Sequence, residues 1–175
     1  MSKVYRYFGY GSLINTESLL APVPDACNVR PGYIKGFRRD FSIWDPIGWT
    51  QTNLDVAGEP FCGLDVTREN NQEARVNGVV FELSEGSLSA LIEREREYEV
   101  IQTLAYDYGS SEEIGVCYLF SAGKNNGNFL FKSPAQIRYL EVYVNSRNKY
   151  GEKFKNEFEE TAYINGKSLK QYSAF

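Results

Sequence analysis

Short segments with the composition of β-strands, separated by glycine-rich turns, fill the first two thirds of the chain. They are rich in Val, Tyr and Phe, and Gly, Asn or Asp residues separate one from the next, which is typical of short strands joined by turns. We predict strands within residues 3–10, 28–44 (two strands, punctuated by Gly32 and Gly36), 59–66, 75–83 and 113–121. This part of the chain is therefore expected to form a small sheet or barrel.

The last third has the pattern of helices. Ser133 followed by Pro134 is a favoured helix start, because serine caps the first turn and proline fits its first position. A second helix is predicted after Gly151, and the two apolar repeats that indicate these helices are Ile137, Leu140, Val144 and Phe154, Phe158, Ala162. With one helix inserted after residue 84, the predicted fold class is α+β, a small mixed sheet or barrel with one inserted and two C-terminal helices. We expect a single domain over residues 1–165 and a C-terminal tail over 166–175.

The net charge and the cysteines limit which partners and which cellular compartment are expected. The net charge of −4 gives no electrostatic reason to bind nucleic acid or an anionic membrane, because those partners need clustered Lys and Arg. We therefore expect a small-molecule partner, no nucleic acid and no membrane, and leave the oligomeric state open, a homodimer included. Cys27, Cys62 and Cys117 match neither a CxxC motif nor a dense disulfide framework, and no apolar run approaches the ~20 residues of a membrane span. A soluble protein of the cytoplasm is expected.

The chain contains no histidine, which excludes most hydrolase chemistry. Without imidazole there is no Ser-His-Asp or Cys-His pair and no His-ligated zinc, so no metal or other cofactor is expected. An acid or base must be a carboxylate, Lys, Tyr or Cys. Ser12, in the stretch "YGSL", therefore has no conventional activating base, and we interpret it as a residue that shapes a turn.

The inserted helix places one carboxylate apart from its neighbours. In "SEGSLSALIEREREYEV", starting near Ser84 or Ser87, one face is marked by Leu88, Leu91 and Ile92. At about 100° per residue, Glu95 falls on that apolar face, whereas Glu97 lies about 180° away from it. An ionised carboxylate among apolar groups is costly unless it is paired or hydrogen-bonded. Glu95 is thus a functional candidate, unless the helix ends before it or a buried Arg pairs with it.

Four motifs in order resemble the γ-glutamylcyclotransferase superfamily. They are "FGYGSL" (8–13), "GYIKGFRRDF" (32–41), "NGVVFEL" (77–83) and "LIEREREY" (91–98), and the first and last are most similar to its ChaC-like branch. The resemblance covers residues 5–98, and it implies a γ-glutamylcyclotransferase-like fold. Two positions depart from the family pattern, because Ile92 stands where the family has Asp and no basic residue follows Tyr98 closely.

The resemblance also implies an activity. These enzymes cyclise a γ-glutamyl group: its own α-amine attacks its γ-carbonyl, which gives 5-oxoproline and releases the attached amine. Glu95 aligns with the family's catalytic glutamate, a general acid/base whose pKa apolar surroundings would raise. The loop of Tyr10, Gly11, Ser12 and Leu13 would bind the substrate through backbone N–H groups, and Tyr139 is the nearest match to a family tyrosine near the site.

Several alternatives stay open at this stage. The loop after the first strand also suits an ordinary strand-to-helix turn, and Arg38 and Arg39 suit either a second substrate carboxylate or surface charge. A non-catalytic protein that binds a γ-glutamyl or other small acidic metabolite is the competing function, because folds often outlive their chemistry. Glutathione, γ-glutamyl amino acids and γ-glutamyl amines share the end that such a site would recognise, so the sequence does not choose among them.

Overall fold

The chain folds into two compact units. In the computed structural model, which describes residues 4–45, 59–95, 98–123 and 127–172, one unit comprises Met1–Arg38 and Val66–Gly123 and the other Arg39–Asp65 and Lys124–Phe175. We call them the barrel unit and the sheet-helix unit. Strands β3 (Phe37–Asp45) and β4 (Phe61–Arg68) each contain one of the three points at which the chain passes from one unit to the other. No helix in these described ranges is long and apolar enough to cross a membrane.

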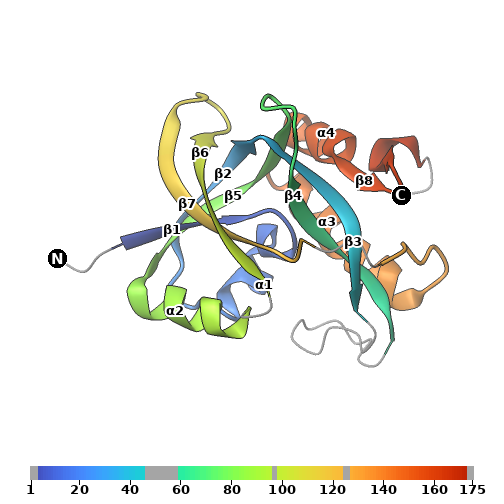
Figure 1. The fold of residues 1–175 in the computed structure, drawn as a ribbon, viewed down its shortest axis with the longest axis horizontal. Coiled ribbons are helices and arrows are strands. Elements are labelled where there is room, and N and C mark those ends of the chain that lie inside the picture. Colours follow the sequence, from blue (N-terminus) through green and yellow to red (C-terminus); the bar gives the residue numbers. More distant parts are fainter. Residues whose placement is uncertain (1–3, 46–58, 96–97, 124–126, 173–175) are drawn as a thin grey trace. The chain divides into compact units, whose positions relative to one another are not determined.

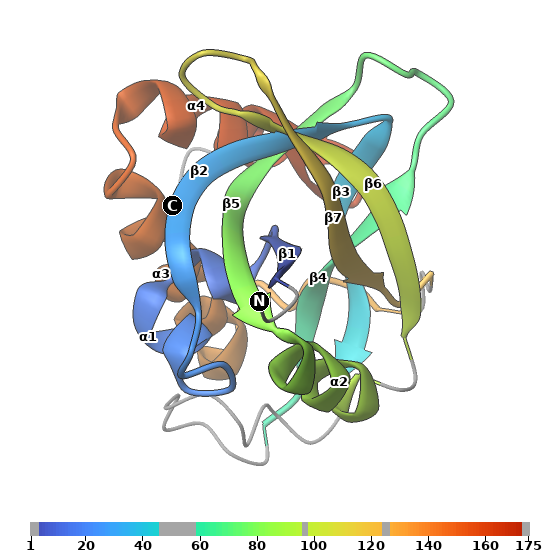
Figure 2. The ribbon, with the colours of Figure 1, turned by 90° about the vertical axis from the view of Figure 1, so that its left-hand side faces the viewer.

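Five strands close the barrel unit into a small barrel (Figures 1 and 2). Their order is β1-β5-β2-β6-β7, and a parallel contact between β1 and β7, at Tyr7 and Tyr118, completes the ring. The strands are β1 (Val4–Gly9), β2 (Cys27–Lys35), β5 (Arg75–Ser84), β6 (Glu99–Asp107) and β7 (Glu113–Ser121). The short helices η1 (Ser12–Ile14) and α1 (Thr16–Leu20) follow β1, and α2 (Glu85–Arg94) follows β5.

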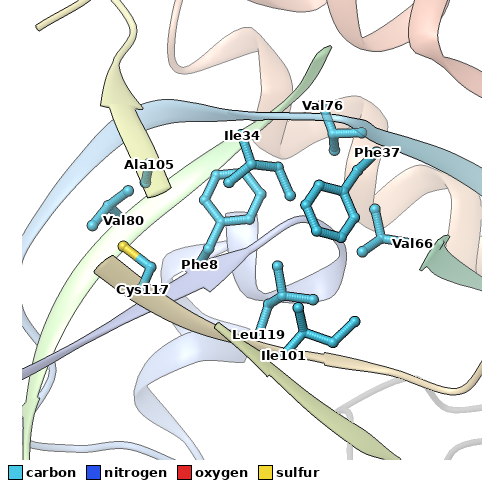
Figure 3. Packing of buried hydrophobic residues seen from close by; sticks show 10 residues of the cluster. All are labelled: Phe8, Ile34, Phe37, Val66, Val76, Val80, Ile101, Ala105, Cys117 and Leu119. Atoms are coloured by element: carbon cyan, nitrogen blue, oxygen red, sulfur yellow. The ribbon is translucent and has the colours of Figure 1, made fainter. Parts of the chain in front are cut away.

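Apolar side chains fill the interior of the barrel. Figure 3 shows Phe8, Ile34 and Phe37 directed toward one another, with the aliphatic side chains of the neighbouring strands around them. The full cluster is Phe8, Ile34, Phe37, Val66, Val76, Val80, Ile101, Ala105, Cys117 and Leu119, and each member is at most 6% exposed. A barrel of this size is packed solid by its own side chains. A ligand site of the barrel unit therefore belongs at its rim or on its loops.

The sheet-helix unit combines strands and two helices. A sheet of order β4-β3-β8-β9 includes the short strands β8 (Ala162–Ile164) and β9 (Lys167–Ser168), and the helices are α3 (Pro134–Asn148), α4 (Glu152–Thr161) and the 3-10 turn η2 (Leu169–Gln171). Glycine at 151 permits the φ of +88° that starts α4. Phe154 and Phe158 of this helix are fully buried, as their spacing of four residues predicts.

The predicted α+β fold class is confirmed. Each predicted strand segment contains a strand, and the three predicted helices are present. Two details were wrong: Gly32 lies inside β2, so only Gly36, with a φ of +75°, separates β2 from β3, and Ile137 of α3 is exposed. Strands β6 and β8 were not predicted. The segment expected to be a tail contains β9 and η2, and the single-domain boundary at residue 165 stays a prediction.

Candidate functional site

The end of β1 and the loop after it pack very closely against β5. A Cβ atom on Gly78 would overlap the carbonyl oxygen of Gly9 and would lie 2.7 Å from Cζ of Phe8. A Cβ atom on Gly9 would in turn lie 2.9 Å from Cβ of Leu13, at the far side of the loop. Only glycine fits at either position without displacement of the backbone. Gly78 therefore lets β5 approach the end of β1 closely, and Gly9 lets the loop fold back over the end of its own strand.

A tight turn shapes the loop of Tyr10, Gly11, Ser12 and Leu13. Its hydrogen bonds are donated by the N–H of Ile14 to the Gly11 carbonyl and by the N–H of Asn15 to the Ser12 carbonyl, both at 3.0 Å. As at any helix start, this pattern does not use the preceding N–H groups, here those of Gly11, Ser12 and Leu13. Consecutive N–H groups of this kind can bind an anion. Ser12 is 9% exposed, which fits a residue that shapes the turn.

The Tyr10 side chain connects this loop to β7, the strand that pairs with β1 to close the barrel. Its hydroxyl donates a 2.7 Å hydrogen bond to the carbonyl of Phe120, on β7. Its ring is half-buried and packs against the hydrophobic cluster of Figure 3. Sequence reasoning placed Tyr10 in the site but did not find this contact, because its two residues are 110 positions apart.

Glu95 caps the C-terminal end of α2. The helix ends at Arg94, and the Glu95 N–H still donates to the Leu91 carbonyl at 2.9 Å, while the Tyr98 N–H donates to the Glu95 carbonyl at 2.8 Å. Glu95 is half-buried, whereas Glu93 on the preceding turn is exposed. The helix therefore ends before Glu95, which is one of the alternatives left open above, so helical periodicity does not support the assignment of this residue and the assignment rests on the resemblance.

The predicted apolar face of α2 was partly wrong. Leu88 and Leu91 are 4% and 3% exposed, but Ile92 is 36% exposed. Two buried leucines three residues apart suffice for a helix of ten residues that covers only one edge of the barrel. Glu97, predicted to lie on the outer face, is outside the described residues.

Asp25 fixes the other end of α2. Ser84 caps the helix by accepting from the Ser87 N–H, and Asp25 accepts from the Ser87 hydroxyl at 2.6 Å and from the Ser84 N–H at 3.2 Å. A carboxylate beside a helix N-terminus also opposes the helix dipole favourably. Sequence reasoning left the helix start at either Ser84 or Ser87 and missed Asp25, which lies about 60 residues away in the chain.

The Asp25 contacts predict a pH-dependent contribution to stability. The Ser87 hydroxyl, followed by the Ser84 groups, holds the pKa of Asp25 below its usual value. A carboxyl whose pKa is lower in the folded state stabilises the fold above its unfolded pKa of about 4, and this contribution disappears as the pH falls through the folded pKa. Asp25→Ala should therefore melt below the wild type at pH 7, and the difference between the two melting temperatures should shrink as the pH falls below about 4 and through the folded pKa. Thermal melts across this range test it, and a difference that persists unchanged at low pH would contradict it.

Tyr139 belongs to the sheet-helix unit and is used there. It is 5% exposed, and its hydroxyl accepts a 3.0 Å hydrogen bond from the Leu64 N–H. One turn earlier, the Gln136 side chain accepts from the Cys62 N–H at 2.8 Å and donates to the Cys62 carbonyl at 3.0 Å. Both side chains of α3 thus satisfy the backbone of β4, an outer strand of its sheet. A role for Tyr139 toward a substrate stays a prediction.

Arg39 and the buried cysteines have structural positions. Arg39 is fully buried, with its guanidinium 3.7 Å from the ring centroid of Phe158, and it donates to the Thr161 hydroxyl at 3.1 Å. It is therefore not surface charge. Burial raises the pKa of the Cys62 and Cys117 thiols to about 12, so neither supplies a thiolate nucleophile near neutral pH. Arg38 is half-buried, and its role stays open.

Comparisons with known proteins bear on the fold. No family model and no curated protein matches the chain. A structure described as a γ-glutamyl cyclotransferase has a TM-score of 0.62 at 20% identity, over 89% of this chain and 85% of that chain. A human protein described as uncharacterized has a TM-score of 0.60 at 21% identity, over 88% of this chain and 84% of that chain.

A yeast structure described as a γ-glutamyl cyclotransferase specific to glutathione is also similar. Its TM-score is 0.59 at 12% identity, over 97% of this chain and 99% of that chain. Identities of this size speak for the fold and not for the substrate or the chemistry. The resemblance that four sequence motifs predicted is confirmed at this level: the chain has the γ-glutamyl cyclotransferase fold.

Proposed function

We propose that this protein is an enzyme that cyclises the γ-glutamyl group of a small γ-glutamyl compound to 5-oxoproline. The observation that carries the proposal is the coincidence, in one compact unit of this fold, of a glycine-dependent loop after β1 and the half-buried carboxylate of Glu95. The two features come from the first and last of the four motifs.

Glu95 is the proposed general acid/base. It accepts a proton from the substrate's α-ammonium group, and the freed amine attacks the γ-carbonyl carbon, which forms the ring C–N bond. The tetrahedral intermediate then collapses and the C–N bond to the leaving amine breaks. That amine takes up two protons, the one held by Glu95 and the one that the ring nitrogen loses as it becomes the lactam N–H, and departs as an ammonium ion.

The N–H groups of Gly11, Ser12 and Leu13 supply the second part of the proposed mechanism. Directed at the γ-carbonyl oxygen, they stabilise the negative charge that forms on it; directed at the α-carboxylate, they orient the amine for attack. The nucleophile belongs to the substrate, so the scheme needs no activated serine or thiolate. The three free cysteines, of which two are buried, and the composition favour the cytoplasm as the place of this reaction.

The test is the release of 5-oxoproline from a panel of γ-glutamyl compounds. Glutathione comes first, because the similar yeast structure is described as specific to it, followed by γ-glutamyl amino acids and γ-glutamyl amines. We expect 5-oxoproline from at least one compound with a free α-amine and none from its N-acetylated analogue, since acetylation removes the nucleophile. Equal turnover of the blocked analogue would refute intramolecular attack. Binding of a γ-glutamyl compound without any product would favour the non-catalytic alternative.

A further inference from the structure

Tyr10 is the link between the candidate binding loop and β7. Strands β1 and β7 meet at Tyr7 and Tyr118, and β1 ends two residues later, at Gly9. Beyond that point the chain leaves the sheet, and the hydroxyl of Tyr10 reaches the Phe120 carbonyl at 2.7 Å. This side-chain bond holds the chain after β1 against β7, beyond the point where the backbones of the two strands pair. The backbone that follows it directly is that of Gly11, Ser12 and Leu13.

The contact determines what the Tyr10 hydroxyl can do. A phenol has one proton to donate, and in this geometry that proton is directed at the Phe120 carbonyl. The ring packs against the filled barrel core, so the side chain cannot turn toward a ligand without opening that packing. Tyr10 is therefore placed to hold its own backbone in position rather than to donate a proton to a substrate.

We propose that Tyr10 is a positioning residue, whose hydroxyl fixes the N–H groups of Gly11, Ser12 and Leu13 by tying the loop to β7. The role in turnover rests on the proposed function, in which these groups meet the substrate. Gly9 and Gly78 set the start of the loop by close packing, and the turn closes on the Asn15 N–H. Tyr10 supplies the restraint between these two points. Preorganised donors lose much of their effect when their backbone is free to move.

The substitution Tyr10→Phe tests this inference, with Tyr5→Phe as its matched control. Tyr5 lies in β1 and Tyr10 directly follows this strand. Each substitution removes one hydroxyl and keeps the aromatic ring. The Tyr5 hydroxyl donates to Glu85 Oε1 at 3.1 Å in an exposed place, away from the loop. In Tyr10→Phe we expect the amides of Ile14 and Asn15, whose hydrogen bonds close the turn, to exchange with deuterium roughly fivefold faster or more, while those of β5 keep their wild-type rates.

Kinetics with the best γ-glutamyl substrate complete the test. We expect kcat of Tyr10→Phe to fall roughly tenfold with a smaller change in KM and an unaltered pH profile, because the donors act mainly in the transition state and Glu95 is untouched. Tyr5→Phe should match the wild type in exchange and in turnover.

The two readouts fail separately. Unchanged exchange at Ile14 and Asn15, or faster exchange with wild-type kcat, would overturn the positioning role while the cyclisation activity stands. A wild type that turns over none of the panel would overturn the proposed function and, with it, the role in turnover. The exchange measurement would still decide whether the hydroxyl restrains the loop, because it needs no substrate.

Discussion

Glu95→Gln is expected to lower turnover by roughly 100-fold or more, with the folded state intact. Glutamine keeps the size and most of the hydrogen-bonding shape of glutamate but cannot accept a proton, so the loss falls on the chemical step. Because Glu95 is half-buried at the C-terminal cap of α2 and glutamine removes a partly buried charge, the variant should melt no lower than the wild type. Initial rates with the best γ-glutamyl substrate, together with a thermal melt, measure both effects.

Glu93→Gln is the matched control for this prediction. Glu93 lies on the same helix two residues earlier and is exposed, so its loss should change stability by no more than about 0.5 kcal/mol and leave turnover nearly intact. The wild-type rate should also decline as the pH is lowered, because protonation of Glu95 removes the base. If Glu95→Gln turned over substrate as fast as the wild type, the catalytic role of Glu95 would be wrong.

The parts of the fold that local sequence encodes could be predicted. Strands β1, β5 and β7 are apolar, β-branched or aromatic segments bounded by turns, and their positions follow from composition alone. Helices α2 and α3 are introduced by serines whose capping role is also local. The order of four motifs was enough to indicate the fold, although the identity to the similar structures reported above is only 12–21%.

Strand β6 shows why other parts could not be predicted. Its inward residues Ile101 and Ala105 are buried, but its outward residues Val100 and Leu104 are also apolar and are 38% and 39% exposed. The alternation of polar and apolar residues that signals a half-buried strand is therefore missing. It pairs with β7 across a short turn and with β2, which lies more than 70 positions earlier in the chain. The pairing with β2 leaves no local trace in the sequence.

The candidate site also has parts that local sequence indicates and parts that depend on distant contacts. The turn-forming residues of the loop and the carboxylate of Glu95 stand out in the sequence, because glycine and an acidic residue at the end of an apolar stripe are unusual locally. Three contacts join segments that are about 60 to 110 residues apart. They are the hydrogen bonds of Asp25 to the start of α2, the hydrogen bond of Tyr10 to Phe120, and the close approach of Gly9 and Gly78. Each depends on the register of the closed barrel, which the sequence alone does not reveal.

Gly78→Ala is expected to destabilise the protein by about 3 kcal/mol. The added Cβ would overlap the Gly9 carbonyl oxygen and approach Cζ of Phe8 to 2.7 Å. The first of these is backbone in a paired strand and the second belongs to the filled core, so neither can move without breaking packing or hydrogen bonds. For a chain of 175 residues, this corresponds to a melting temperature roughly 6 to 12 °C below that of the wild type.

Gly86→Ala separates this steric effect from the general effect of replacing a glycine. Gly86 lies in α2, and the nearest atom to its added Cβ would be Ser84 Oγ, at 3.9 Å. Alanine is the better helix former, so this variant should be as stable as the wild type or up to about 1 kcal/mol more stable. Opposite shifts of the two melting temperatures would support the close approach of β5 to the end of β1. If Gly78→Ala melted with the wild type, the loop would not be held by that approach, and the restraint on its N–H groups would rest on Tyr10 and the turn alone.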